Sequence, residues 1–322
     1  MLCVVPLLRA LRQRYPDAYL ALMASPVNVD VMRGNRYLDE VILYDKREFL
    51  EHGRLHLISF FKFVRSLRAR KFTVALVPST VSTSFTSDLL AYLSGAPCRI
   101  GAGVLNGHSN KSAFLFTVPL ALDWESTPDR HQTVRNIDSA ADLDLGHPSN
   151  LSLEITLLAE EEKAGHALVE QVKRGKRYVV GYHPGAGKPP NRWPSDRFAS
   201  VISQLSKELD AAAIVTCGPM DLDVVKELEK GLDGSFYLLT GQPIRRVAAI
   251  LKSVDLVITN DTGIMHVAAA VGVPVLSLFG PTSPEQWAPQ GERHRYIAGE
   301  NGDIRTIALE KVVENARSMI CS

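Results

Sequence analysis

Short apolar runs alternate with longer amphipathic segments along the whole chain, and this alternation limits the possible folds more than any other feature. The clearest unit is residues 254–279, where an apolar strand pattern, a turn through Asp261 and a small-residue helix pattern precede a second apolar run. Repeated strand–helix–strand units place parallel strands side by side in a sheet covered by helices. The sequence therefore predicts an α/β fold.

The alternation runs through both halves of the chain. In the first half we expect strands at residues 18–23, 40–43, 72–77 and 98–101, and helices at residues 6–15, 26–33, 57–70, 83–94 and about 130–145. In the second half we expect strands at residues 178–183, 212–217, 235–239, 254–259 and 273–279, and helices at residues 195–209, 221–230, 244–252, 263–271 and about 307–319. We expect a long glycine-containing loop after residue 101. Residues 1–5 resemble the end of a strand, which suggests a natural start upstream of Met1.

The length of the chain indicates two domains. It has 322 residues, and single cores stop growing at roughly 250–300 residues. A linker is predicted at residues 146–158, where Pro148 and polar residues interrupt the periodicity. We expect a first domain at 1–155, a second at 156–305, and a last helix, 306–322, that crosses back to the first. Two Rossmann-like doubly wound sheets facing each other across a cleft would bind ligands at the carboxyl ends of their strands.

Composition excludes several classes of protein. The net charge of +1 provides no overall field for nucleic acid. Cys3, Cys98, Cys217 and Cys321 form no CxxC pair, so the sequence supports neither a zinc site nor a redox motif. Free thiols without a recognisable signal peptide are typical of a reducing cytosol. We therefore expect a cytoplasmic protein.

The strongest local signal is the turn through Asp261, Thr262 and Gly263, which follows a strand pattern and opens a helix. Asp261 or Thr262 would cap the helix, and Gly263 would let a ligand approach the backbone. Free N–H groups at a helix start favour an anion such as a diphosphate. His266 falls one turn into this helix. A capped helix with a satisfied histidine explains the same residues without a ligand.

A second loop follows the strand pattern at residues 178–183. Residues 182–188 have the sequence Tyr-His-Pro-Gly-Ala-Gly-Lys, which matches neither a Walker A loop nor GxGxxG. The absence of GxGxxG also argues against a nicotinamide dehydrogenase. Backbone amides together with Lys188 and Arg192 would suit a leaving diphosphate, although both side chains would equally fit a solvated loop. Trp193 is interpreted as a packing residue.

Two pairs of acidic residues have DxD spacing, and neither predicts a metal site. Asp142 and Asp144 lie on an expected helix, where residues two apart diverge. Asp221 and Asp223 open a helix, where acids favour the helix dipole. One of these last two would instead accept hydrogen bonds from ribose hydroxyls.

Residues 57–71 combine an aromatic apolar side with basic residues. One interpretation is a helix that docks on an anionic lipid or lipopolysaccharide surface. The other, which the sequence alone favours, is an amphipathic core helix with a solvated basic edge.

Taken in order, these segments resemble the ADP-heptose:lipopolysaccharide heptosyltransferases, glycosyltransferase family 9. The resemblance rests on the segments at 183–186, 192–194, 216–219, 240–241, 260–270 and 279–282, and in the first half on those at 6–12, 94–101 and 131–136. Its most specific element is the Asp-Thr-Gly-x-x-His block that starts at Asp261. The weaker Phe-Gly-Pro-Thr loop at 279–282 follows the last strand pattern.

The resemblance implies an inverting, metal-independent enzyme of the GT-B fold. It would move L-glycero-D-manno-heptose from an ADP donor to the lipopolysaccharide core or another lipid-linked saccharide. The ADP-sugar is a substrate, and no cofactor is expected. The resemblance leaves open a peripheral contact with the cytoplasmic face of the inner membrane.

Transferred to this sequence, the resemblance predicts three sets of site residues. The donor diphosphate and sugar would contact His183, Gly185, Ala186, Lys188, Asn191, Arg192, Asp261, Thr262, Gly263 and His266. The nucleoside would contact Cys217, Gly218, Asp221, Asp223, Thr240 and Gly241. The acceptor would contact Arg99, Gly101, His131 and Arg135.

The sequence departs from the family pattern in two places. The aspartate thought to act as the base would lie just before Met1, so the catalytic residue is not assigned. Asn191 stands where many members carry a lysine, and Lys188 lies close enough to compensate. Two alternatives therefore stay open: a nucleotide-binding protein without catalysis, and another GT-B enzyme such as a nucleotide-sugar epimerase.

Overall fold

The chain forms two compact units. The computed structural model describes residues 1–51, 54–146, 148–219, 221–232 and 235–321. Residues 1, 3–29 and 36–151 form the first unit, and residues 2, 30–35 and 152–322 form the second. The boundary falls within the predicted linker 146–158, of which residue 147 lies outside the described part. The predicted domain limits, with residues 306–322 crossing back, stay a prediction.

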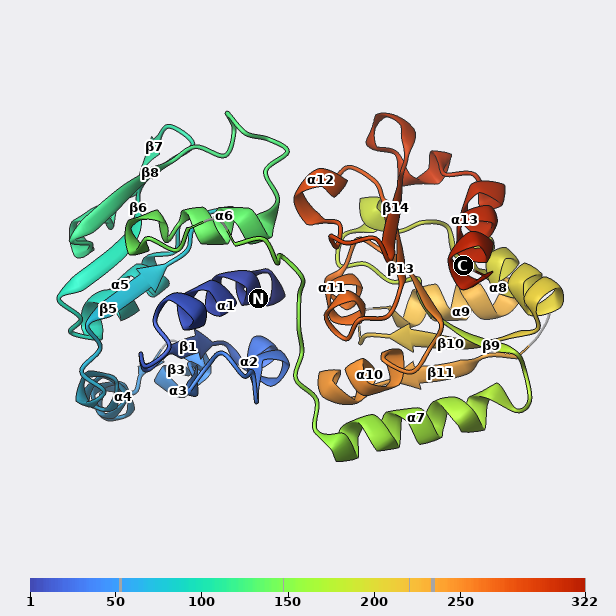
Figure 1. Ribbon diagram of the computed structural model, residues 1–322, viewed down its shortest axis with the longest axis horizontal. Coiled ribbons are helices and arrows are strands. Elements are labelled where there is room, and N and C mark those ends of the chain that lie inside the picture. Colours follow the sequence, from blue (N-terminus) through green and yellow to red (C-terminus); the bar gives the residue numbers. More distant parts are fainter. Residues whose placement is uncertain (52–53, 147, 220, 233–234, 322) are drawn as a thin grey trace. The chain divides into compact units, whose positions relative to one another are not determined.

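Besides the antiparallel pair of β3 (Leu50–Glu51) and β4 (Arg54–Leu55), the first unit contains two small sheets flanked by helices (Figure 1). In one, β1 (Ala21–Ala24) pairs parallel with β2 (Glu40–Leu43). In the other, β6 (Cys98–Leu105) pairs parallel with β5 (Val74–Val77) and β8 (Val118–Leu122), and antiparallel with β7 (His108–Ser109). Its longer helices are α1 (Val5–Arg14), α4 (Leu57–Ala69), α5 (Phe85–Leu93) and α6 (Gln132–Asp138), while α2 (Pro26–Met32) begins in this unit and its residues 30–32 belong to the second.

Two expectations for the first unit are wrong. Residues 2–4 form a 3-10 turn that leads into α1, rather than the end of a strand; proline in the first turn of α1 suits this start. The loop expected after residue 101 is the continuation of β6. A Cβ on Gly101 would lie 2.2 Å from the Phe116 ring, and one on Gly103 would lie 2.7 Å from Pro119. These glycines therefore allow close packing on a strand rather than a loop conformation.

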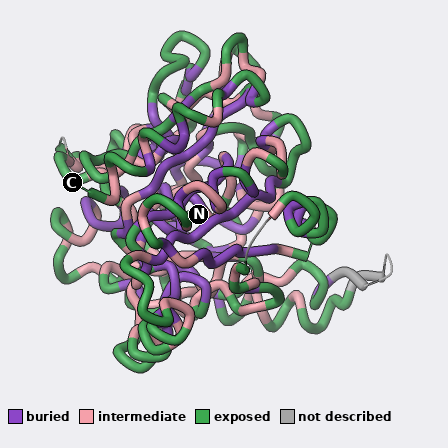
Figure 2. The backbone as a smooth tube through the Cα atoms, turned by 90° about the vertical axis from the view of Figure 1, so that its right-hand side faces the viewer, coloured by how far each residue is buried: buried purple, intermediate pink, exposed green. Residues whose placement is uncertain are grey.

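The second unit is a doubly wound sheet of six parallel strands. Their order is β11 (Tyr237–Thr240), β10 (Ala211–Cys217), β9 (Tyr178–His183), β12 (Leu256–Asn260), β13 (Val275–Phe279) and β14 (His294–Ala298). Figure 2 shows its central strands as buried. β12 and β13 are buried at every position, as expected for continuous apolar runs in a parallel sheet. The Rossmann-like arrangement predicted from the sequence is confirmed.

Two hydrophobic clusters fill the two faces of this sheet. One includes side chains of α8 (Ser195–Leu209), α9 (Leu222–Gly231) and α13 (Leu309–Cys321). The other includes side chains of α7 (Ala159–Lys173), α10 (Ile244–Leu251) and α11 (Gly263–Ala270). Helix α13 packs on α8 and β12 within this unit.

The sequence did not indicate α7 or the edge strand β14. In α7 only Gly165 and Val169 are buried, so the helix lacks a broad apolar stripe. A Cβ on Gly165 would lie 2.3 Å from the carbonyl oxygen of Ala249, which explains how α7 approaches α10 so closely. In β14 only Ile297 is buried. Both elements are held by neighbours that are distant in the sequence, and local periodicity does not reveal them.

An ion pair joins β2 to the end of α4 and yields a stability prediction. Arg70 donates two hydrogen bonds to the Glu40 carboxylate, one of them 2.7 Å long from Nε, and the Tyr19 hydroxyl donates another of 2.7 Å. These bonds, chiefly those from Arg70, lower the pKa of Glu40 to about 2. A carboxyl pKa below its unfolded value stabilises the fold above that value. The stabilisation is lost as the pH falls from about 4.5 towards 2.

We expect Glu40→Gln to lower the free energy of unfolding at neutral pH by about 1 kcal/mol, because the pair is partly exposed to solvent. Denaturant titrations at neutral pH and at a pH near the folded pKa of Glu40 measure the effect. The difference from the wild type shrinks at the lower pH. Glu229→Gln, on the exposed side of α9, is the matched control and leaves stability unchanged. An equal loss at both pH values would contradict the assignment.

Candidate functional site

Three loops meet at one edge of the second sheet. They follow the neighbouring parallel strands β9, β12 and β13, in which Thr259 pairs with His183 and Asn260 pairs with Leu278. Since the carboxyl ends of parallel strands lie at the same edge, the loops starting after these residues emerge together. The residues predicted for the donor lie on the first two of these loops and at the start of the helix that follows the second; the third loop is the weaker Phe-Gly-Pro-Thr motif at 279–282.

Asn260 holds the first two loops together. Its side chain is fully buried, and Nδ2 donates to the carbonyl oxygens of Pro184 at 2.8 Å and Gly185 at 3.3 Å. Its Oδ1 accepts a 3.2 Å bond from the backbone N–H of Trp193. One buried amide thus fixes both ends of the loop that carries Lys188. Trp193 is buried, as predicted for a packing residue.

Asn191 joins all three loops. Its Nδ2 donates to Asp261 Oδ2 at 3.2 Å and to Thr282 Oγ1 at 3.1 Å. Burial raises the pKa of Asp261, while a bond from Thr282 and the charge of Lys188 lower it. The charge of Lys188 thus acts on this carboxyl group, and the lysine is exposed. Thr282 belongs to the Phe-Gly-Pro-Thr loop, a motif too short to predict a site residue from sequence alone.

The start of α11 is open at this edge. Thr262, rather than Asp261, caps the helix, since its Oγ1 accepts a 3.1 Å bond from the N–H of Ile264. Gly263 is exposed, and a Cβ added to it would meet no atom within 4 Å. A helix start with free space in front of it is a suitable place for an anion.

Asp221 lies beneath the loop that follows β9. Its Oδ2 accepts a 3.1 Å bond from the N–H of Gly218 and lies 4.0 Å from His183 Nε2. Its Oδ1 lies 3.7 Å from an Arg192 nitrogen. A Cβ on Gly185 would lie 2.2 Å from the Asp221 carboxyl carbon, so the loop passes directly over this carboxylate.

His183 and Arg192 take fixed positions beside Asp221. His183 Nδ1 lies 2.9 Å from Thr216 Oγ1. Burial lowers the pKa of His183 more than Asp221 and Thr216 raise it, which favours the neutral imidazole. Arg192 donates from Nε to the carbonyl oxygen of Ala186 at 2.9 Å and lies 3.4 Å from Asp223.

The residues predicted for the nucleoside lie along the same edge. Cys217 and Thr240 end the neighbouring strands β10 and β11 and pair in register. Gly218 and Gly241 follow directly. Burial raises the pKa of the Cys217 thiol, which favours its neutral form. The predicted donor and nucleoside sets therefore occupy neighbouring strand ends, with Asp221 between them.

His266 differs from the other predicted donor residues in its surroundings. It lies on α11, and its ring is 6.2 Å from that of Trp287 on α12 (Pro284–Trp287). Its role in donor binding stays a prediction.

The four residues predicted for the acceptor make local contacts in the first unit. Arg99, near the amino end of β6, donates to the carbonyl oxygens of Leu115 and Ala96 at 2.7 Å each. Gly101 makes room for the Phe116 ring. His131 caps α6 through a 3.2 Å bond from the N–H of Thr133.

The fourth, Arg135, donates to the carbonyl oxygens of Thr80 and Pro128 at 3.2 and 3.3 Å. Its guanidinium carbon lies 5.4 Å from the centre of the Trp124 ring, and burial lowers its pKa. Thr80 follows the carboxyl end of β5, whereas Arg99 sits near the amino end of β6. Arg99 and the bond partner of Arg135 therefore lie towards opposite ends of the strands in the sheet of β5 and β6. Acceptor binding by the four predicted residues stays a prediction.

Within the described residues, no group of three or more His, Cys, Asp or Glu side chains is arranged to hold a metal ion. The two DxD pairs have basic neighbours instead. Asp144 lies 3.4 Å from Arg14, and Asp221 and Asp223 flank Arg192.

A model of the glycosyltransferase family 9 (heptosyltransferase) matches residues 60–316. This span is well over half of the chain and contains all three loops of the candidate site. The chain belongs to glycosyltransferase family 9. It is therefore a glycosyltransferase, and the family resemblance seen in the sequence is confirmed.

Relatives and solved structures agree with the family match. Lipopolysaccharide heptosyltransferase 2 of Escherichia coli (strain K12) is 27% identical over 307 residues, covering 90% of this chain and 82% of that protein. A glycosyl transferase of family 9 from Veillonella parvula superposes with a TM-score of 0.86 at 22% identity, over 99% of this chain and 93% of that one. The E. coli ADP-heptose lps heptosyltransferase II gives a TM-score of 0.81 at 24% identity, over 100% and 95%. These two structures support the α/β fold.

Proposed function

We propose that this enzyme transfers heptose from ADP-L-glycero-D-manno-heptose to the lipopolysaccharide core, with inversion and without a metal ion. The names of its relatives, a lipopolysaccharide heptosyltransferase and an ADP-heptose heptosyltransferase, support this donor and acceptor. The observation that carries the proposal is the meeting of three loops at one sheet edge. There, Lys188 and Arg192 accompany the open start of α11.

Transfer requires positive charge where the ADP diphosphate departs. As the bond to the sugar breaks, negative charge grows on the diphosphate and an oxocarbenium-like centre forms at the sugar. We propose that the N–H groups at Thr262 and Gly263 and the cations Lys188 and Arg192 stabilise the diphosphate together. These groups replace the metal ion that other transferases use for the same purpose.

Lys188 is proposed to take the role of the lysine that many family members carry at the position of Asn191. Asn191 is buried, and its side-chain amide donates hydrogen bonds to Asp261 and Thr282. Its role is therefore to hold the loops together. Lys188 is exposed on the same loop and close enough to Asp261 to influence its pKa. A cation is thus retained beside the Asp-Thr-Gly turn at a different position in the sequence.

The acceptor hydroxyl must lose a proton to a general base. The residue that acts as this base is not assigned, and acceptor binding by the predicted set in the first unit stays a prediction. We also propose that the enzyme works in the cytoplasm and touches the inner membrane peripherally, because its proposed acceptor is a lipid-anchored saccharide.

The proposal is tested by incubating the protein with ADP-heptose and a lipopolysaccharide truncated at its heptose acceptor. We expect a heptose-extended acceptor with the inverted anomeric configuration, release of ADP, and an unchanged rate in EDTA. Free sugar or an isomer formed without acceptor would instead indicate an epimerase, an alternative that the family match does not favour. ADP binding without transfer would indicate the non-catalytic alternative.

Gly263→Ala separates ligand binding from folding. The added Cβ meets no protein atom within 4 Å, so we expect an unchanged melting temperature. It would occupy the space in front of α11, and we expect ADP affinity to fall by at least about tenfold because the diphosphate must approach the backbone there. Calorimetry with ADP and with adenosine measures this. Adenosine affinity, which depends on the ends of β10 and β11, stays unchanged; equal losses for both ligands would contradict the placement.

A further inference from the structure

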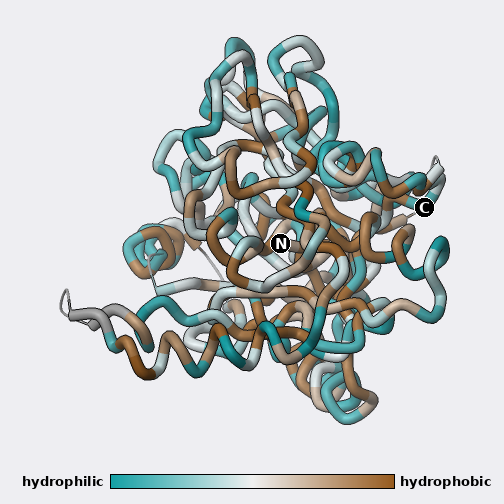
Figure 3. The backbone as a smooth tube through the Cα atoms, turned by 90° about the vertical axis from the view of Figure 1, so that its left-hand side faces the viewer, coloured by the Kyte–Doolittle hydropathy of each residue, from teal (hydrophilic) through white to brown (hydrophobic). Residues whose placement is uncertain are grey.

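Helix α4 has apolar side chains on two opposite faces, and the fold packs only one of them. On the inner face, the rings of Phe60 and Phe63 lie 5.8 and 5.3 Å from that of Phe49, and Leu67 is buried. On the outer face, Leu57, Ile58 and Phe61 are 53%, 75% and 65% exposed. Figure 3 shows both apolar and hydrophilic stretches along this helix. The amphipathic core helix with a solvated basic edge, which the sequence alone favours, explains the basic residues of this outer face but not its exposed apolar side chains.

Basic side chains continue the same outer face. Lys62 and Arg65 follow Ile58 by four and seven residues, which places all three on one side of a helix. Both are exposed, and within the described residues neither forms an ion pair with an acid. The sequence of α4 itself contains no Asp or Glu. Cations beside exposed apolar side chains, without acids among them, are typical of helices that lie in a membrane interface.

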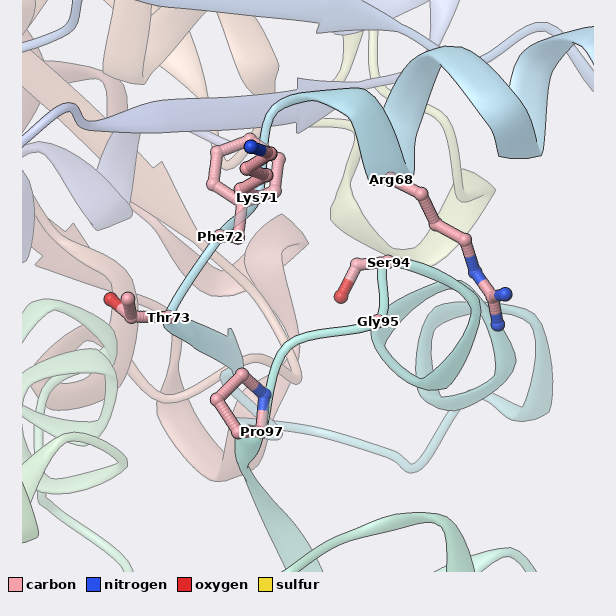
Figure 4. Close-up of a pocket in the computed structure, with 7 residues that line it drawn as sticks. All are labelled: Arg68, Lys71, Phe72, Thr73, Ser94, Gly95 and Pro97. Atoms are coloured by element: carbon pink, nitrogen blue, oxygen red, sulfur yellow. The ribbon is translucent and has the colours of Figure 1, made fainter.

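A pocket extends this basic face beyond the end of α4. It has a volume of about 660 Å³ and is lined by Arg68, Lys71, Phe72, Thr73, Ser94, Gly95 and Pro97 (Figure 4). Thr73 and Pro97 precede strands β5 and β6, so the pocket lies at the amino edge of this sheet. That edge is opposite to the one at which parallel strands bind their ligands.

We infer that α4 is a docking surface for the anionic phospholipids of a bilayer. The outer side chains Leu57, Ile58 and Phe61 enter the boundary between headgroups and acyl chains. The cations Lys62, Arg65, Arg68 and Lys71 meet the phosphate headgroups. Three apolar side chains and a few cations give weak, reversible attachment rather than anchoring. Within the described residues, no helix has the length and apolarity needed to span a membrane.

A lipid-anchored saccharide has to be reached at the bilayer, so this surface would bring the enzyme to its acceptor. This part of the inference rests on the acceptor named in the proposed function. The choice of a bilayer over a protein partner rests on the charge pattern. A row of cations along an apolar strip matches a laterally uniform anionic surface, and α4 offers no acid to orient a protein partner.

Co-sedimentation with vesicles tests the inference. One set of vesicles contains phosphatidylcholine alone, and the other also contains phosphatidylglycerol. We expect the wild-type protein to bind the second set in a salt-sensitive manner. The double variant Ile58→Ser/Phe61→Ser should bind at least about tenfold more weakly, because it removes apolar area from the interface. Lys62→Glu/Arg65→Glu should lose the preference for phosphatidylglycerol.

The matched controls make the same kinds of substitution at exposed residues of other helices. Val27→Ser alters another exposed apolar side chain on α2, and Lys311→Glu reverses an exposed charge on α13. Both should bind vesicles like the wild type, and all variants should keep its melting temperature. Equal binding by the α4 variants and the controls, or no wild-type binding to anionic vesicles, would overturn the inference. The inference would also be overturned if the α4 variants lost affinity for deacylated lipopolysaccharide while their binding to vesicles stayed unchanged.

Transfer to a deacylated, water-soluble acceptor separates this inference from the proposed function. The α4 variants should transfer heptose to such an acceptor at the wild-type rate while failing to bind vesicles. A wild-type protein that binds anionic vesicles but transfers no heptose would contradict the proposed function and leave the docking surface standing.

Discussion

Lys188→Ala is expected to lower the rate of heptosyl transfer by about 10²–10³-fold, since removing one group that stabilises developing charge typically costs about 2.7–4 kcal/mol of barrier. Lys188 is exposed, and its charge acts on the Asp261 carboxyl group, near which we propose that the diphosphate departs. Its charge matters most in the transition state, so kcat should fall more than KM rises. Steady-state kinetics with ADP-heptose and a truncated lipopolysaccharide measure both parameters.

The conservative variant and a distant control sharpen this test. Lys188→Arg retains the charge and should recover part of the rate. Lys207→Ala removes an exposed lysine from α8 of the same unit and should keep full activity. A loss below about threefold in Lys188→Ala, far short of the effect of one stabilising group, would show that Lys188 does not replace the family lysine.

Gly185→Ala is expected to damage both the fold and the donor site. The added Cβ would lie 2.2 Å from the Asp221 carboxyl carbon, and that carboxylate is buried and bonded to the N–H of Gly218. Overpacking of this kind costs about 1–3 kcal/mol. Because the same loop carries Lys188, we also expect ADP affinity to fall by at least about tenfold, as a misplaced diphosphate contact would cause. Denaturant titration and calorimetry measure the two effects.

Two comparisons identify the cause. Gly187→Ala adds a Cβ two residues further on, where no atom lies within 4 Å, and should change stability by less than about 0.5 kcal/mol. In the double variant Gly185→Ala/Asp221→Ala the clash is removed, so its loss of stability should be smaller than the sum of the two single losses. Strict additivity would contradict the close approach of the loop to Asp221.

The second sheet was largely predictable from the sequence because its strands are buried on both faces. Such strands appear as continuous apolar runs, and β9 and α8 have the predicted bounds. Once these strands are predicted to be parallel, the meeting of the donor loops can be predicted too, because the carboxyl ends of parallel strands share one edge of the sheet. Individual bonds were not predictable, because Asn191 meets partners 70 and 91 positions away. Those contacts depend on strand register, which no local pattern specifies.

The first unit was less predictable because the sequences around its glycines and of helix α4 are each compatible with two different structures. Gly101 and Gly103 suggested a loop, yet they lie on β6 and admit Phe116 and Pro119. Helix α4 looked like an ordinary amphipathic core helix. Only the fold shows that Phe60 and Phe63 satisfy the inner face while Ile58 and Phe61 stay exposed. Periodicity gives the apolar positions of a helix but not the number of faces that its neighbours cover.

The central claim is that peptide N–H groups and basic side chains of the second unit hold the donor diphosphate without a metal ion. Calorimetry of the wild-type protein with ADP and with adenosine, both in EDTA, tests it most directly. We predict that ADP binds in EDTA as tightly as without it, and at least about tenfold more tightly than adenosine, which lacks the diphosphate. Equal affinities for the two ligands, or loss of ADP binding in EDTA, would contradict the claim.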